Sequence, residues 1–134
     1  MSYSLDGGVT WTNLTLTDNT NIATINAGGK ILFKGINSSL SSATNKYWKF
    51  APSKKFDVCG NAMSLLFGDN FKNRSSFGSG KYQFNELFYG IETLINAKNL
   101  ILPATTLTEH CYGMMFYNCT NLTTAPELPA TKLA

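Results

Sequence analysis

Apolar and polar residues alternate along the first fifty positions in a way that predicts short β-strands. Residues 3–11 hold a Gly-Gly pair between two strand-like arms, which predicts a hairpin. Residues 12–17 alternate with both leucines on one face, and residues 22–25 and 30–34 form two further short runs between Gly and Asn turns. Strands of this length and spacing favour an antiparallel sandwich or a small barrel.

The hydrophobic pattern changes at residues 56–67. The run that begins at Phe56 alternates as a strand, and the apolar residues after Asn61 recur at helical spacing. Asn61 is a suitable N-cap because its side chain can accept a hydrogen bond from a free amide of the first turn. We expect this stretch to be the irregular first coil of a repeat region and to close its end.

The C-terminal part of the chain, from Phe84 onward, repeats itself. Three segments recur in order: 87–89 as 115–117, 94–97 as 122–125, and the Leu-Pro-Ala-Thr corner 102–107 as 128–133. Phe88 and Leu102 are 14 positions apart, whereas Phe116 and Leu128 are 12 apart, so the second copy lacks two residues. A period of this length with Leu at fixed offsets is typical of a leucine-rich solenoid.

Each copy is expected to form one coil with a short helix, a short strand and the Leu-Pro-Ala-Thr corner. The helices are predicted at residues 83–89 and 109–117, and the strands near Leu100 and at residues 122–124. The predicted interior ladders are Leu94, Leu102, Leu107, Leu122, Leu128 and Leu133, with Phe88 and Phe116. The predicted fold class is therefore α+β. A small antiparallel β unit at residues 1–55 precedes a short leucine-rich-repeat solenoid at 56–134, with an irregular first coil and about two regular ones.

The second copy also carries a family resemblance. Its Phe116, Cys119 and Leu122 match the Phe-x-x-Cys-x-x-Leu core of BspA-like leucine-rich proteins, which are abundant in gut Bacteroides and their phages. The earlier copy keeps the Phe and Leu but has Ile91 at the Cys position. The resemblance implies a solenoid linked to adhesion and surface recognition. The residues before it resemble a module often found ahead of such repeats, which implies no activity. Because no polar closing cap follows the last corner, we expect a longer repeat array or a docked second copy.

Composition and charge narrow the function classes. Only 14% of the residues are charged, below the usual level of about 25%, and Asn, Thr, Ser and Gly take their place. This surface suits polar neutral partners such as sugars or other protein copies, and a net charge of +3 is too weak to indicate nucleic acid. No run of about 20 apolar residues predicts a membrane span, and no N-terminal signal peptide is visible.

The residue types that support catalysis are sparse. A lone His110, with no nucleophile motif and no carboxylate pair in a catalytic frame, indicates a protein that is not an enzyme and needs no cofactor or metal. Three cysteines do not form a disulfide framework, and a bridge between Cys111 and Cys119 stays open.

The predicted function is non-catalytic surface recognition or adhesion, with a protein or glycan as ligand. Candidate ligand-binding residues are the aromatic pair Tyr47 and Trp48, and Thr123, Thr124 and Glu127 on the predicted sheet face. The alternative is a structural component of a phage virion or surface appendage, in which the open end makes oligomer contacts. The expected location is the cell surface, or outside the cell as part of a longer parent, with the virion as the alternative.

Overall fold

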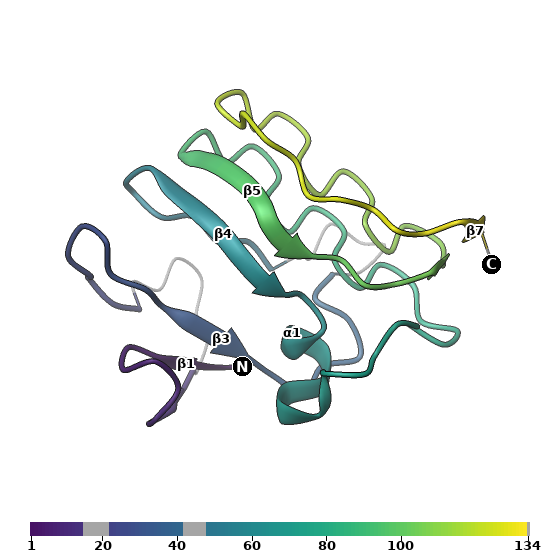
Figure 1. The fold of residues 1–134 in the computed structure, drawn as a ribbon, viewed down its shortest axis with the longest axis horizontal. Coiled ribbons are helices and arrows are strands. Elements are labelled where there is room, and N and C mark those ends of the chain that lie inside the picture. Colours follow the sequence, from purple (N-terminus) through teal and green to yellow (C-terminus); the bar gives the residue numbers. More distant parts are fainter. Residues whose placement is uncertain (15–21, 42–47, 134) are drawn as a thin grey trace.

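A computed structural model describes residues 1–14, 22–41 and 48–133 of this chain of 134 residues. The strands are β1 (Ser2–Ser4), β2 (Thr12–Asn13), β3 (Leu32–Lys34), β4 (Phe56–Asn61), β5 (Leu94–Ile101), β6 (Thr106–Leu107) and β7 (Lys132–Leu133). One α-helix, α1 (Ser64–Phe67), is followed by a 3-10 turn, η1 (Gly68–Asn70). The strands form three small open sheets, ordered β2-β1-β3, β4-β5 and β6-β7 (Figure 1).

The N-terminal sheet confirms the predicted hairpin. β1 pairs antiparallel with β2 on one side and with β3 on the other. The Asp6 carboxylate accepts hydrogen bonds from the Ser4 hydroxyl and from the amide and hydroxyl of Thr10, which fixes the loop between the arms. The predicted sandwich or barrel is wrong, because this sheet is three short strands with two open edges. Residues 22–25 form no strand, and residues 15–17 of the predicted strand 12–17 lie outside the described part.

β4 and α1 follow the change in hydrophobic pattern. The Asn61 side chain accepts a hydrogen bond from the Met63 amide at 2.9 Å, but the N-cap of α1 is Met63 and has no side-chain cap, so the prediction of Asn61 as N-cap is wrong. The helix ends after four residues at Gly68, whose φ of 54° no helix interior adopts. α1 is tied to the strand region after β3, because the Gly35 amide donates to the Ser64 carbonyl and the Gly68 amide to the Gly35 carbonyl.

The two segments predicted as helices are series of tight turns instead. In residues 82–90, every fourth residue has a left-handed backbone: Tyr82 at φ 58°, Glu86 at 61° and Gly90 at 65°. The second copy repeats this pattern at His110, Met114 and Asn118. A left-handed residue cannot continue a right-handed helix. Aromatic and aliphatic side chains recur every four residues in such turns as they do in a helix, which is why the pattern predicted helices.

In the structure the two copies of the repeat lie side by side, and their residues pair with the same offsets as in the sequence repeat. Residues 82–90 and 109–117 run side by side, and Asn96 bridges Thr124 in parallel, an offset of 28 positions. After the corner, Thr106 pairs with Lys132, an offset of 26. The change from 28 to 26 is the two-residue deletion recognised in the sequence. The alignment of the copies was therefore correct even though the elements they form were not.

The predicted leucine-rich-repeat solenoid is wrong. The structure is mostly small sheets that do not close, and the described residues contain a single α-helix of four residues. Its interior is one cluster drawn from all parts of the described chain, with Met63, Phe84 and Leu94 fully buried. Of the predicted ladder residues, Leu94, Leu102 and Phe88 are interior, but Leu128 and Leu133 are exposed.

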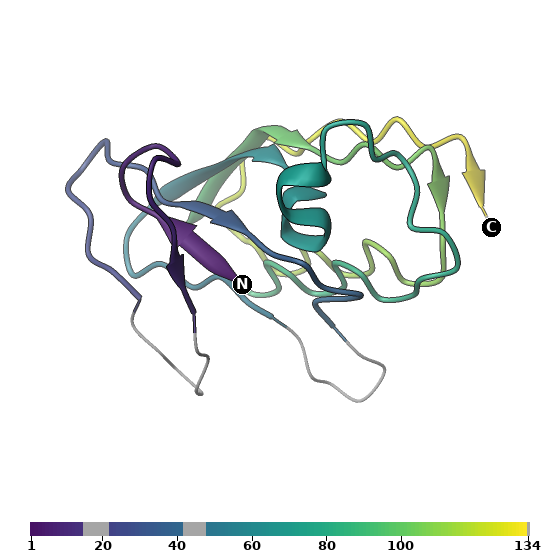
Figure 2. The ribbon, with the colours of Figure 1, turned by 90° about the horizontal axis from the view of Figure 1, so that it is seen from below.

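Residues from the N-terminal part cover the first copy from one side. The Leu40 amide donates to the Gln83 carbonyl, and a row of rings runs from Phe33 through Phe50 to Phe88, with centroids 4.7 and 6.0 Å apart. Figure 2 shows the outcome: the N-terminal sheet lies at one end of the long axis and β7 at the other. In Figure 1 the last segment of the chain runs along the edge of the molecule beyond β5, so the second copy forms an outer flank.

Candidate binding surface

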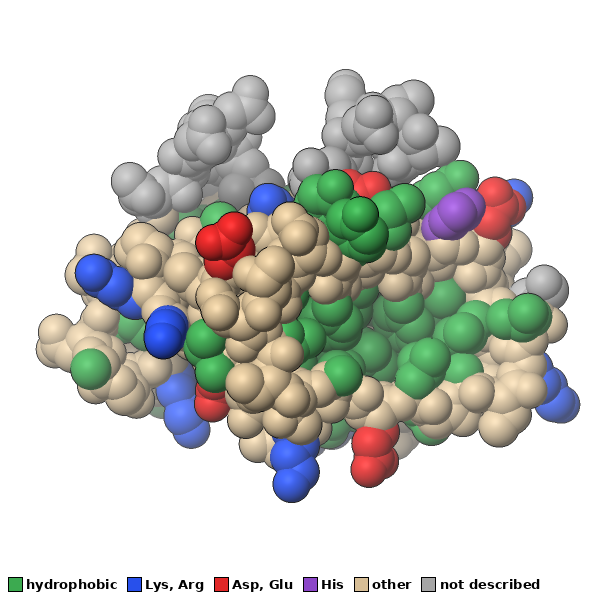
Figure 3. All heavy atoms as spheres, turned by 90° about the horizontal axis from the view of Figure 1, so that it is seen from above, with side chains coloured by type: hydrophobic (Ala, Val, Ile, Leu, Met, Phe, Trp, Pro, Cys, Tyr) green, Lys and Arg blue, Asp and Glu red, His purple; other side chains and the backbone are tan. Residues whose placement is uncertain are grey.

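An apolar trough lies along the outer flank formed by the second copy. The cavity at its centre has a volume of about 430 Å³, with Leu102 at its base. It is lined by Tyr112, Met114, Met115, Phe116 and Tyr117 on one side and by Ala125, Pro126 and Leu128 on the other. Figure 3 looks onto this flank and shows hydrophobic side chains gathered in a hollow between two rims of polar groups and backbone.

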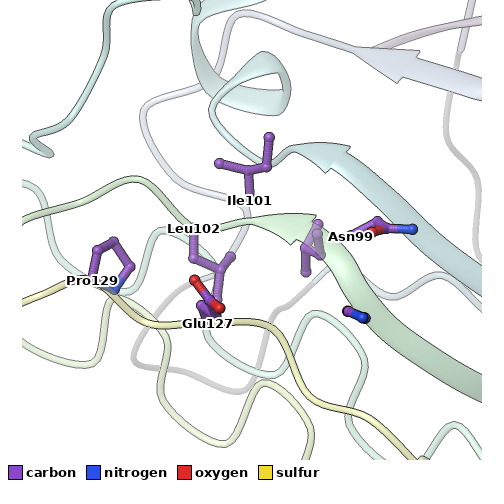
Figure 4. Close-up of a pocket in the computed structure, with 7 residues that line it drawn as sticks. Asn99, Ile101, Leu102, Glu127 and Pro129 are labelled. Carbon is purple, nitrogen blue, oxygen red and sulfur yellow. The ribbon is translucent and has the colours of Figure 1, made fainter.

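A second hollow of about 340 Å³ adjoins the trough through Leu102. The end of β5 and residues 127–129 form its walls, and Figure 4 shows Glu127 and Pro129 across from Asn99 and Ile101. Glu127 and Lys98 bring charge to its border. The two hollows together make a surface with an apolar floor and a polar edge, which is the usual make-up of a protein interaction site.

Three of the predicted site residues lie on one segment, residues 123–127, whose first residues hydrogen-bond to β5. Glu127 lines the second hollow. Thr123 donates both its amide and its hydroxyl to the Ile95 carbonyl at 2.9 Å, and the Thr124 carbonyl accepts the Ala97 amide at 2.9 Å. The Thr123 hydroxyl thus fastens this segment to β5, while both threonines remain exposed.

The aromatic pair predicted as a sugar platform has a different setting. Trp48 is half-buried against the core, with its ring 6.1 Å from that of Phe50. Tyr47 lies outside the described residues. The structure therefore brings Thr123, Thr124 and Glu127 together on one segment and places Trp48 among the rings that cover the first copy.

The sequence did not single out the residues that make the trough. Met114, Tyr117 and Leu128 are 54%, 60% and 51% exposed, and Leu128 was predicted to be interior. A signal was present at Met114, a large apolar side chain at the position that Glu86 occupies in the first copy. Nothing in the pattern distinguished Leu128 from its buried counterpart Leu102.

Titratable groups are few near the trough. Burial raises the pKa of Tyr112, whose hydroxyl is enclosed without a hydrogen-bond partner in the part of the chain that the structure describes. His110 stacks on Tyr82 with centroids 5.0 Å apart and planes 7° apart. Cys111 and Cys119 are buried free thiols rather than a disulfide, and the Cys119 thiol donates to the Phe88 carbonyl at 2.9 Å.

No protein-family model, curated protein or solved structure matches this chain. The resemblance to BspA-like proteins therefore stays a prediction based on the residues quoted for it. Within residues 1–14, 22–41 and 48–133, no three His, Cys, Asp or Glu side chains are grouped as a metal site would require. No helix in those ranges is long and apolar enough to cross a membrane.

Proposed function

We propose that this chain is a non-catalytic recognition module that binds a protein or a glycan through the apolar trough on its outer flank. The observation that carries the proposal is the exposure of Met114, Tyr117 and Leu128 around one connected hollow. Scattered apolar side chains are normal on a protein surface, but a contiguous hollow with a polar rim marks an interaction site. The module would act at a cell surface, or outside the cell as part of a longer protein.

The low charge of the chain supports the same proposal. Glu127 brings a carboxylate to the border of the second hollow, and the exposed Thr123 and Thr124 precede it on the same segment. Side chains of this kind give orientation to a ligand whose burial supplies the affinity.

A second candidate function is assembly with further copies of the chain, as in a virion or appendage. Leu133 is 84% exposed in β7 and Leu128 borders the trough, so both would be covered by an oligomer contact. Light scattering at two concentrations tests this candidate. A defined oligomer that Leu133→Asp dissociates favours assembly, and a monomer at both concentrations rules it out.

Ligand arrays test the recognition proposal directly. The intact chain, Tyr117→Asp and Leu128→Asp are applied to a glycan array and a peptide array, with Val9→Asp as the matched control. Val9 is 83% exposed in the N-terminal hairpin loop, so its substitution adds the same charge away from the trough. The proposal expects ligands that both trough variants lose and the control keeps. Binding that all four proteins share, or no binding on either array, would overturn it.

A further inference from the structure

Backbone amides in the first copy point in two alternating directions. The amides of Tyr82, Phe84, Glu86, Phe88 and Gly90 donate to carbonyls of the second copy, at residues 109, 111, 113, 115 and 117, over 2.8–3.1 Å. Between them, the amides of Leu87, Tyr89 and Ile91 close turns onto carbonyls three residues earlier. One set of amides therefore stabilises the turns of the first copy, and the other set hydrogen-bonds the first copy to the second.

The second copy has the same backbone and therefore the same two sets. Its amides at 111, 113, 115, 117 and 119 close turns three residues back, and its left-handed residues lie 28 positions after those of the first copy. The amides of His110, Tyr112, Met114, Phe116 and Asn118 are thus aimed at the open flank. Among the described residues, none of these five amides has a hydrogen-bond acceptor. We call them the donor row.

The opposite rim of the trough offers no comparable row. Pro126 and Pro129 lack an amide hydrogen, and they follow Thr123 and Thr124, the residues that hydrogen-bond to β5. Proline on an outer strand prevents a further strand from pairing there. The two proline positions cannot donate to the backbone of a ligand, whereas each of the five amides of the donor row can.

The rings beside the donor row repeat those of the first copy. Tyr112 stacks on Phe84, Phe116 on Phe88 and Tyr117 on Tyr89, with centroids 5.3–5.9 Å apart and planes within 15° of each other. The first copy presents three rings to the second copy. The second copy presents three rings at the equivalent positions on its outer side. Phe116 is half-buried and Tyr117 exposed, so ring area remains to be covered.

We infer that the donor row and the adjoining trough bind a polypeptide segment of another protein that resembles residues 108–119. This inference rests on the proposed function and specifies its ligand class. The segment would lay a row of carbonyl oxygens against the five amides. It would also place aromatic side chains at positions i, i+4 and i+5 over Tyr112, Phe116 and Tyr117. The packing of 109–117 on 82–90 inside the chain is the template for this contact.

The same geometry argues against a second copy as occupant. The carbonyls of residues 109–117 already accept the amides of the first copy, so another intact chain cannot offer them. Two chains related by a two-fold axis at this flank would set donor row against donor row. Amides facing amides repel and leave every donor without an acceptor.

The test uses the full chain and a synthetic peptide with the sequence of residues 108–122, carrying Cys111→Ser and Cys119→Ser to prevent oxidation. Binding is measured by fluorescence anisotropy, and amide hydrogen exchange of the chain by NMR. We expect exchange to slow at residues 110, 112, 114, 116 and 118 when peptide is added, and to stay unchanged at the residues between them. Tyr117→Ser and Leu128→Asp in the chain should each weaken binding about tenfold, while Val9→Asp should not.

Each contrary result has a distinct meaning. Absence of peptide binding at millimolar concentration, or protection without the alternating pattern, would overturn the inference. A further outcome is that the peptide does not bind although the intact chain binds a glycan on the array that Tyr117→Asp and Leu128→Asp do not bind. In that case the recognition function stands and its ligand is not a polypeptide. If the five amides become protected at high chain concentration without peptide, the occupant is a second copy and the inference is wrong.

Discussion

Residues 82–107 and residues 109–133 carry the same apolar pattern, yet one copy is core and the other is surface. Phe88 and Leu102 are 2% and 5% exposed, whereas Phe116 is half-buried and Leu128 is 51% exposed. The first copy is covered on one side by Phe33, Leu40 and Phe50 and on the other by the second copy. The burial of a segment in this molecule is therefore decided by the segments that pack against it. Residues at equivalent positions of the two copies can contribute unequally to the free energy of unfolding.

The largest expected effect comes from removing the paired rings. Phe88→Ala should lower the free energy of unfolding by about 3–5 kcal/mol, because a fully enclosed ring leaves a cavity. Phe116→Ala should cost about 1–2 kcal/mol, since one side of its ring already faces the trough. Urea denaturation of both variants measures the difference. Equal losses would mean that the second copy is as well covered as the first.

The corner leucines give the next contrast. Leu102→Ala should cost about 2–4 kcal/mol because Leu102 is buried beneath both hollows. Leu128→Ala should change the free energy of unfolding by no more than about 0.5 kcal/mol, as expected for an exposed side chain. Thermal and urea unfolding check both values, and a destabilised Leu128→Ala would show that the trough is closed in solution.

The left-handed positions allow a backbone test. Gly90 has φ 65° and open space where a Cβ would lie, with the Lys49 Nζ atom nearest at 3.9 Å. Gly90→Ala should therefore cost about 1 kcal/mol from backbone conformation alone. Asn118 occupies the equivalent position at φ 58°, and Asn118→Gly should be neutral or stabilising by a few tenths of a kcal/mol. If Gly90→Ala folds without loss, the backbone at Gly90 is not left-handed.

The smallest expected effect concerns the ion pair that joins the copies at their surface. The hydrogen bond and positive charge of Lys81 lower the pKa of Glu109, and the two groups lie 2.5 Å apart. Because the pKa of Glu109 is lower in the folded state, the pair stabilises the fold at pH values above the unfolded-state pKa of about 4.3. This stabilisation is lost as the pH falls through the folded-state pKa of Glu109. An NMR titration of Glu109 should show a midpoint that moves back up in Lys81→Met, or in high salt. An unmoved midpoint would show that the pair does not form.

The sequence predicted the repeat more accurately than the structure it builds. The recurring Phe-Tyr and Leu-Pro-Ala-Thr segments predicted the correct pairing of the copies, including the two-residue deletion. The hairpin at residues 3–11 was predictable because its Gly-Gly turn is a local signal. The helices were not, because a chain of four-residue turns and a helix repeat their side chains at almost the same interval. The left-handed backbone at every fourth residue distinguishes the two, and at Glu86 and Met114, in the middle of each segment, the residue type does not signal that conformation.

The candidate site was predictable only in part for a related reason. Polar residues at 123, 124 and 127 could be recognised as a surface segment from their sequence. The exposure of Leu128 could not, since the same Leu-Pro-Ala-Thr motif is buried at Leu102. Whether the leucine of this motif is buried depends on which segments pack against it, and a short motif does not encode that.

The two prolines on the outer rim also bear on aggregation. A molecule that leaves apolar side chains such as Leu128 and Leu133 uncovered risks templating fibrous growth through its last strand. Pro126 and Pro129 remove the amides that such growth requires, and β7 is only two residues long. On the other rim, a left-handed residue at every fourth position gives a contour that a flat extended strand cannot follow. The flank can thus keep its apolar surface exposed while it resists the edge-to-edge strand pairing that open sheet edges favour.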